Sequence, residues 1–160
     1  MANITMKSKD TLAAGMARCF VTLDGRRYNL FNAIKLEAKM KKKKSKIAIL
    51  GKPGGGNRAT GWEGSGTLKI HFNTSIFRRY MLEYASTGKD FYFDMQIVNE
   101  DPTNDLGRQT VMLYDCNIDE SILALFDAST DGTLEEDISF TYEDASMSEE
   151  FAMLTGLLVA

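Results

Sequence analysis

Apolar side chains recur at every second position over long stretches of this chain, and this pattern constrains the fold more than any other feature. Between residues 28 and 40, six of the seven even positions are apolar, and only Asn32 interrupts the series. A period of two places side chains on one face of a strand, whereas a helix requires a period near 3.6. Residues 32–44 are rich in helix formers, but a helical stripe there collects only Ala33, Leu36 and Met40. The alternation therefore predicts a long strand.

The second half of the chain contains further alternating segments, which also predict strands. They are residues 68–73, 91–97, 110–118 and 138–142. Within residues 110–118, the even positions are expected to face away from Val111 and Leu113. Residues 99–107 are expected to form a hairpin connection. After residues 19–23, the pair Asp24 and Gly25 favours a tight hairpin turn, because both residues tolerate a positive φ.

One segment has helical spacing instead. Residues 76, 77, 80, 81 and 84 are apolar, Thr74 or Ser75 can cap the start of a helix, and Gly88 can end it. A hydrophobic content of 44% and the length of 160 residues suit one core-forming domain spanning residues 1–160. The order of elements predicts a mostly β member of the α+β class, an antiparallel sandwich or barrel with long hairpins and one flanking α-helix.

Two segments have no sustained period. Residues 1–16 are predicted to form a mobile N-terminal arm. Residues 41–66 are rich in lysine and glycine and are predicted to form a long flexible loop, with residues 47–50 as a short returning strand. The apolar tail at residues 151–160 has about half the length of a membrane span, and no targeting signal is recognisable.

Charge is distributed very unevenly along the chain. Residues 1–60 carry fourteen Lys or Arg against three Asp or Glu, a net charge of +11, whereas residues 61–160 carry five against nineteen, a net charge of −14. Six lysines cluster at positions 39, 41, 42, 43, 44 and 46. This asymmetry indicates that the basic segment has an acidic partner, either nucleic acid or a protein surface that a second copy of the chain already provides.

No motif for catalysis or metal binding is complete. Residues 50–56 resemble a phosphate-binding loop, but Pro53 replaces the required hydroxyl residue. Residues 127–134 imitate the start of a calcium loop, but Ile138 stands where a bidentate Glu is needed. The single histidine, His71, lies on the polar side of its strand, and Cys19 and Cys116 are too far apart in sequence for a zinc motif. We expect no enzyme activity, no cofactor and no metal.

The lysine cluster leaves a second class of function open. Its positive charges suit DNA phosphates, although no helix-turn-helix, zinc finger or aromatic stacking platform accompanies them. A nucleic-acid-binding accessory protein is therefore the alternative to a self-assembling protein.

Five segments, in their order and spacing, resemble the tail tube proteins of PBSX-like prophages and of contractile bacteriophage tails. They are residues 61–68, the helix at 77–84, and residues 91–94, 111–119 and 135–144. The resemblance extends from about residue 18 to residue 151, and the lysine cluster and the tail at residues 154–160 depart from it. It implies a tail-tube-like fold and a structural subunit of a phage, prophage or bacteriocin-like tail tube, with a tube for secreted effectors as a further possibility.

The resemblance also implies partners and locations. Six copies would form a ring, their hairpins would join into an inner barrel of 24 strands, and the rings would stack into a hollow tube through which DNA or effectors pass. Tail sheath and tail-end proteins would bind this tube, with no membrane insertion. Assembly would take place in the cytoplasm of a bacterial host, and the product would be a virion or a tail-like particle.

Particular residues are expected at the surfaces of such a tube. Lys41, Lys42, Lys43, Lys44, Lys46 and Trp62 are predicted to contact a neighbouring subunit, which would order the segment that carries them. In the strand at residues 91–98 the odd positions are apolar and are expected to face the core. Asp94 and Gln96 then lie on the other face and are the candidates for lining the channel.

Overall fold

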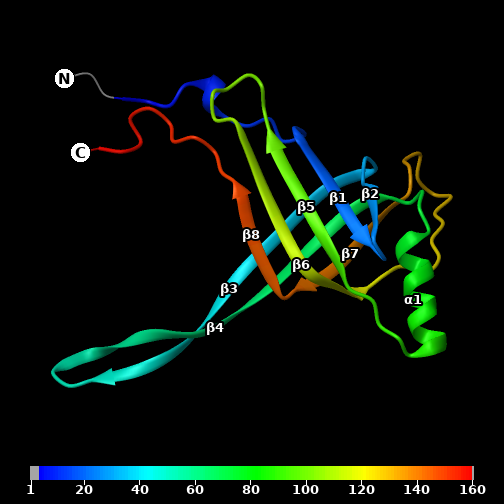
Figure 1. The fold of residues 1–160 in the computed structure, drawn as a ribbon, viewed down its shortest axis with the longest axis horizontal. Helices are drawn as coiled ribbons and strands as arrows, with labels where there is room; N and C mark the ends of the chain where they lie inside the picture. The colour runs from blue at the N-terminus through cyan, green and yellow to red at the C-terminus, as the bar shows by residue number, and fades with distance from the viewer. Residues whose placement is uncertain (1–3, 160) are drawn as a thin grey trace. The chain divides into compact units, whose positions relative to one another are not determined.

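The computed structural model describes residues 4–159 (Figure 1). Its elements are a 3₁₀ turn Ser8–Asp10, strands β1 Ala17–Leu23, β2 Arg26–Asn29, β3 Ala33–Ile49 and β4 Lys52–His71, helix α1 Ile76–Thr87, and strands β5 Phe93–Glu100, β6 Arg108–Glu120, β7 Glu135–Tyr142 and β8 Asp144–Glu149. The strands hydrogen-bond in the order β2-β1-β5-β6-β7-β4-β3, and β8 also pairs with β6. The predicted fold class, mostly β with one helix, is confirmed. Strand β8 was not predicted.

The described chain divides into two compact units. One contains residues 4–31, 93–114 and 145–159, and the other contains residues 32–92 and 115–144. A single domain over residues 1–160 stays a prediction. Within residues 4–159, no helix is both long enough and apolar enough to cross a membrane.

The first unit is built on the β1–β2 hairpin and on β5. Asp24 and Gly25 have φ values of 49° and 74°, so the predicted tight turn is confirmed and the strands can pair with Leu23 opposite Arg26. Strand β1 pairs with β5 in antiparallel register. The hydrophobic core of this unit includes Val21 and Met95, which are almost completely buried.

The N-terminal segment of this unit is bound to the loop that follows β5. Asp101 accepts hydrogen bonds from the backbone N–H of Ala13 at 2.9 Å and of Thr103 at 2.9 Å, and the Asn104 side chain donates to the carbonyl of Thr11 at 3.2 Å. These bonds fix residues 11–13. The mobility predicted for residues 1–16 stays a prediction, and residues 1–3 of that range lie outside the described residues.

The second unit contains the β3–β4 hairpin, and here the sequence prediction is wrong. Residues 41–66 are not a loop, because β3 runs without interruption to Ile49, the chain turns at Leu50 and Gly51, and β4 begins at Lys52. Lysine and glycine have low strand propensity, which is why the sequence indicated a loop. Backbone pairing along the whole hairpin overrides that propensity, and the lysine side chains extend into solvent without any desolvation cost.

Strand β4 connects this hairpin to the core of the second unit. Residues 64–71 of β4 pair with β7 as well as with β3. Leu68 and Ile70 are buried there against Ile138 and Phe140, as the alternation in residues 68–73 predicts. Residues 64–71 of β4 therefore belong to the core of the unit, and the preceding residues of β4 extend beyond it.

Strand β6 departs from the predicted alternation. Thr110, Leu113, Cys116 and Ile118 are all buried, so the even positions do not share one face throughout. Burial changes from even to odd positions between Thr110 and Leu113, and back to even positions between Leu113 and Cys116. Asp115, whose φ of 53° is left-handed, lies at the second change, where this conformation can turn the following side chains to the other face.

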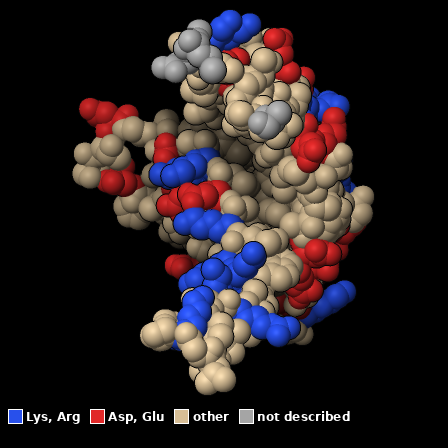
Figure 2. Space-filling view, turned by 90° about the vertical axis from the view of Figure 1, so that its left-hand side faces the viewer, with Lys and Arg blue, Asp and Glu red and all other residues tan. Residues whose placement is uncertain are grey.

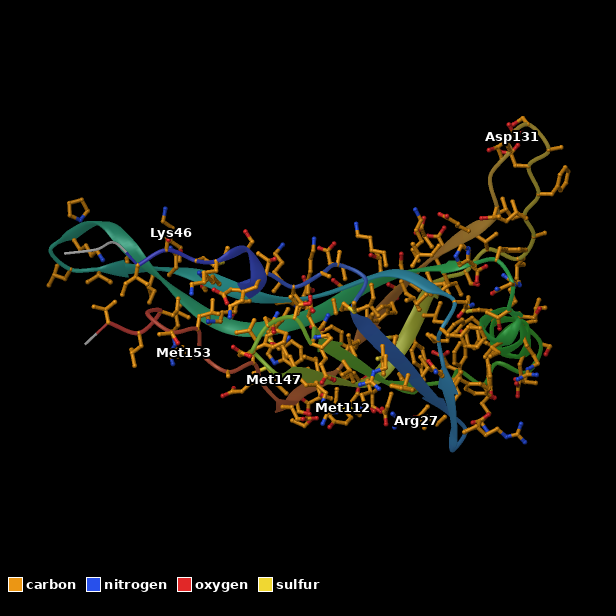
Figure 3. The ribbon with its side chains drawn as sticks, turned by 90° about the horizontal axis from the view of Figure 1, so that it is seen from above. Arg27, Lys46, Met112, Asp131, Met147 and Met153 are labelled. Carbon is orange, nitrogen blue, oxygen red and sulfur yellow. The ribbon has the colours of Figure 1, made fainter. Side chains whose placement is uncertain are left out.

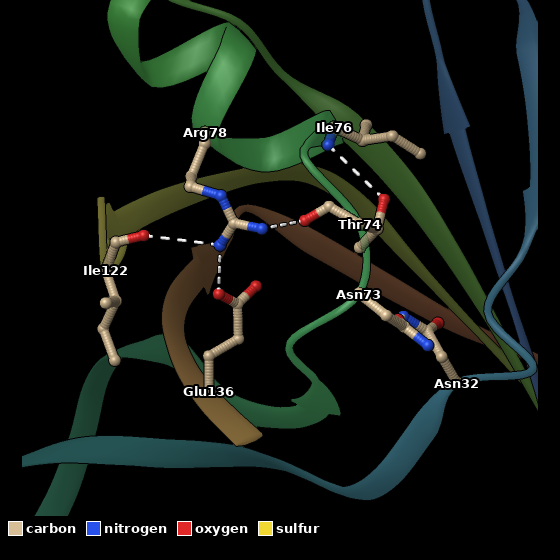
Figure 4. A network of polar contacts seen from close by, with 7 residues as sticks. All are labelled: Asn32, Asn73, Thr74, Ile76, Arg78, Ile122 and Glu136. Atoms are coloured by element: carbon tan, nitrogen blue, oxygen red, sulfur yellow. Dashed lines mark hydrogen bonds and ion pairs between the residues drawn. The ribbon is translucent and has the colours of Figure 1, made fainter. Parts of the chain in front are cut away.

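Helix α1 begins after Ser75 and ends at Gly88, as predicted, where a φ of 74° closes the last turn. Arg78 holds the start of this helix against β7 and the loop before it (Figure 4). Its guanidinium group forms an ion pair with the buried carboxylate of Glu136, and it also donates to the carbonyl oxygens of Thr74 and Ile122. The guanidinium group also lies 4.2 Å from the centre of the Phe72 ring. Loop 121–134 is thereby fixed where it leaves β6.

Candidate assembly surfaces

Half of the β3–β4 hairpin has no other strand beside it. From the Lys41 and Glu63 pair outward, β3 and β4 pair only with each other among the described residues. We call residues 41–63 the ribbon; it projects beyond the other strands of its unit in Figure 1. A two-stranded hairpin alone is at best marginally stable in water, and its two open edges can pair with another chain. The ribbon is therefore a candidate surface for assembly.

Aromatic rings from β7 pack on glycines at the base of the ribbon. A Cβ atom at Gly64 would lie 2.4 Å from the Tyr142 ring, and one at Gly66 would lie 2.5 Å from the Phe140 ring. The Tyr142 hydroxyl donates to the carbonyl oxygen of Lys39 at 2.7 Å. The pKa of Tyr142 is raised, mainly because burial disfavours the ionised form of its hydroxyl group. Only glycine leaves space for these rings, so Gly64 and Gly66 allow the β7 rings to pack against β4 at the base of the ribbon.

The predicted subunit-contact residues all lie on the ribbon. The five lysines are exposed on β3: Lys41, Lys42, Lys43, Lys44 and Lys46. Only Lys43 has a carboxylate within 4.0 Å among the described residues, that of Glu63 at 3.9 Å. Trp62 pairs with Lys42 across the strands, is 39% exposed, and its ring centre lies 6.1 Å from that of Tyr142. Figure 2 shows basic side chains gathered over this part of the molecule.

The end of the ribbon is apolar rather than basic. Ile47, Ile49 and Leu50 are exposed there, so the lysines lie along the ribbon behind an apolar tip. An apolar centre with charged residues around it is the usual composition of a protein–protein contact. The sequence indicated the lysines but not this tip.

Loop 121–134, between β6 and β7, is the acidic counterpart in the same unit. Leu123 and Phe126 are 59% and 89% exposed, and Asp127 and Asp131 are also exposed. The Ser129 hydroxyl and backbone N–H donate to Asp127, which lowers the pKa of its carboxyl group. Residues 109–160 contain no Lys, Arg or His. The sequence indicated an acidic turn at residues 127–134, and the exposure of Phe126 beside this turn is known only from the structure.

The polar face of β3, β4 and β7 carries a shallow hollow of about 270 Å³. Its lining residues are Glu37, Lys39, Ser65, Gly66, Thr67, Asp119, Ser139 and Phe140. The side chains of Glu37 and Lys39 form an ion pair at 3.2 Å, and Asp119 adds a second carboxylate to the lining. Within residues 4–159, no three His, Cys, Asp or Glu side chains are grouped to hold a metal ion.

The candidates for lining a channel lie on β5, in the first unit. Phe93 and Met95 are buried, as expected, and Asp94 and Gln96 are half-buried between them. Arg27 donates to the side-chain oxygen of Gln96 at 2.7 Å. This face therefore carries a cation as well as the predicted acid.

Two comparisons of the sequence with known proteins match most of the chain. A family model described as "Phage tail tube protein" matches residues 4–149. The "Phage-like element PBSX protein XkdM" of Bacillus subtilis (strain 168) is 33% identical over 149 residues, which cover 93% of this chain and 98% of that protein.

Two solved structures have a similar fold. A chain in the cryo-EM structure of the anti-feeding prophage baseplate, 6-fold symmetrised, superposes with a TM-score of 0.64 and 12% identity, covering 92% of this chain and 97% of that chain. A chain in the sheath–tube complex of an extracellular contractile injection system superposes with a TM-score of 0.60 and 10% identity, covering 88% and 93%.

Proposed function

The chain belongs to the phage tail tube protein family and is a structural subunit of such tubes, and from this premise we propose that its copies assemble as six-membered rings that stack into a hollow tube. The open sheet supports this proposal. Strands β2 and β3 end the strand order without a further partner among the described residues, and ring closure removes such edges. A chain of similar fold occurs in a baseplate symmetrised 6-fold.

The observation that carries the proposal is the ribbon. Its two strands are exposed along their length and its lysines are largely without carboxylate partners in the described chain, so it is built for contact with another molecule. In the proposed ring stack, Lys41, Lys42, Lys43, Lys44, Lys46 and Trp62 contact a neighbouring subunit. Individual exposed ion pairs contribute about 0–1 kcal/mol, and six copies per ring multiply that contribution.

The channel and the further partners follow from the same proposal. The polar face of β5, with Asp94 and Gln96, lines the channel, where polar groups let a passing DNA molecule or effector slide. Sheath and tail-end proteins bind the tube; a chain of similar fold is part of a sheath–tube complex. The tube assembles in the cytoplasm of a bacterial host, becomes part of a virion or tail-like particle, and acts as a conduit rather than as an enzyme.

Assembly of the purified protein tests the proposal. Light scattering as a function of concentration, followed by negative-stain electron microscopy, is expected to give rings and tubes. Because the exposed lysines also suit nucleic acid, an electrophoretic mobility assay with double-stranded DNA belongs beside it. A protein that remains monomeric at high concentration and retards DNA would refute the tube proposal and favour the nucleic-acid-binding alternative.

A further inference from the structure

We propose that the ribbon of one copy docks on loop 121–134 of a second copy, head to tail. The inference rests on the tube proposal and adds the receiving surface, which the lysine cluster alone does not identify. It depends on three properties of the second unit: the placement of the two surfaces, their matching chemistry, and the fixed base of the loop.

The two surfaces lie at opposite ends of one strand. Strand β4 begins at Lys52 in the ribbon and ends at His71, whose partner Glu135 directly follows loop 121–134. Figure 3 shows Lys46 and Asp131 at these two ends. The lysines at residues 41–46 of β3 pair with residues 57–63 of β4, which lie 8 to 14 residues before His71. At roughly 3.3 Å per residue this separation is about 26–46 Å, at least three times the Debye length of about 8 Å at physiological ionic strength. The ribbon therefore cannot be neutralised by the loop of its own copy.

The charges of the two surfaces are opposite. The ribbon carries five lysines on β3, and Lys52 and Arg58 on β4, with Glu63 as its only acid. All the charged side chains that the loop and its flanks expose are acids: Asp119, Glu120, Asp127, Asp131, Glu135 and Asp137. Hydrogen bonds from the Ser129 hydroxyl and backbone N–H lower the pKa of the Asp127 carboxyl group. Opposite potentials of this kind speed association and fix orientation.

Exposed apolar side chains also match. The ribbon tip offers Ile47, Ile49 and Leu50, and the loop offers Leu123 and Phe126, all well exposed. Phe126, which directly precedes Asp127, is 89% exposed and so contributes little to the core of its own unit, but it can act as an anchor of an interface that also contains charged groups. Both surfaces therefore combine exposed apolar side chains with charges, and the charges of the two surfaces are opposite in sign.

The base of the receiving loop is fixed before any partner arrives. Arg78 is bonded to the carbonyl oxygen of Ile122 and to the carboxylate of Glu136, which hold the loop at both of its ends (Figure 4). A surface that is already ordered loses less conformational entropy on binding. Because the two contacting surfaces differ, the contact is heterologous and propagates from copy to copy instead of stopping at a dimer.

Engineered cysteines test this contact directly. The native thiols of Cys19 and Cys116 are buried, and burial raises the pKa of Cys19 to about 12, so neither competes for a thiol reagent. The double variant Leu50→Cys with Phe126→Cys, assembled and treated with a short bis-maleimide, is expected to give a ladder of dimers, trimers and higher species on a denaturing gel. Both positions are exposed, so the substitutions leave the core intact.

Matched variants separate the possible outcomes. Leu50→Cys alone and Phe126→Cys alone are expected to give no ladder, and so is Leu50→Cys combined with Leu82→Cys, because Leu82 is exposed on α1. Normal tubes with no ladder from the Leu50 and Phe126 pair, or with an equal ladder from the Leu82 control, would overturn this inference and leave the tube proposal standing. Absence of rings from the unmodified protein would contradict the tube proposal itself.

Discussion

Replacing Gly64 by alanine tests how the ribbon is joined to the core. The new Cβ would lie 2.4 Å from ring atoms of Tyr142, far inside van der Waals contact, so the ring has to move. Overpacking of this kind costs about 1–3 kcal/mol, and displacing the ring also breaks the 2.7 Å hydrogen bond to the carbonyl oxygen of Lys39, which contributes about 1 kcal/mol. We expect Gly64→Ala to lower the free energy of unfolding by about 2–4 kcal/mol.

The measurement is urea unfolding followed by circular dichroism and by the fluorescence of Trp62. Trp62 is the only tryptophan in the chain, and its ring centre lies 6.1 Å from that of Tyr142, so its emission reports on the base of the ribbon. Gly61→Ala is the matched control, because a Cβ at Gly61 meets no atom within 4 Å.

A second control separates steric conflict from loss of strand flexibility. In a Tyr142→Ala background the ring is absent, and Gly64→Ala should then cost much less, since contacting residues are not additive. If Gly64→Ala and Gly61→Ala destabilise the protein equally, within about 0.5 kcal/mol, the proposed packing of Tyr142 on Gly64 is refuted.

Three further predictions concern charged groups. Replacing Lys41, Lys42, Lys43 and Lys44 together by Glu should reduce tube yield, and added salt should do the same to the unmodified protein; unchanged yield by sedimentation would count against an ionic ribbon contact. Glu136→Gln leaves Arg78 buried without its carboxylate and should cost about 3–5 kcal/mol in denaturant unfolding, whereas Glu149→Gln, at the exposed pair with Arg108, should change little. Hydrogen bonds from the N–H groups of Ala13 and Thr103 lower the pKa of Asp101. The contribution of Asp101 to stability is therefore present above the ordinary carboxyl pKa of about 4 and is lost as pH falls through the lower pKa of the folded state. Cleavage by an acid-active protease within residues 4–16 should increase on acidification, and Asp101→Asn should remove that dependence.

Local signals in the sequence predicted the parts of the fold that local chemistry decides. Asp24 and Gly25 tolerate the positive φ of a tight turn wherever they occur, and Gly88 ends a helix for the same reason. Alternation predicted the burial of Phe93 and Met95 in β5, whereas farther along the strand Ile97 is half-buried and Val98 is buried. In β6, the buried positions change parity before Leu113 and again after it, the second time at the left-handed residue Asp115, and the alternation does not indicate where these changes fall.

The ribbon could not be predicted, because pairing between distant residues forms it. Neither the lysines of β3 nor the glycines of β4 favour a strand, and the space for Tyr142 at Gly64 is visible only when the two strands are side by side. The residues of the candidate surfaces also differ in how far the sequence could predict them. The sequence indicated the lysines, because they are clustered along the chain, whereas Phe126 became a candidate only when the structure showed its side chain exposed beside Asp127.

A cryo-EM reconstruction of tubes grown from the purified protein will show where the ribbon and β5 lie in the assembly. We expect stacked rings of six subunits, in which each ribbon is covered by a neighbouring subunit and the side chains of Asp94 and Gln96 face the channel. Rings in which residues 41–63 project uncovered into solvent, or in which Phe93 and Met95 face the channel, would contradict this expectation.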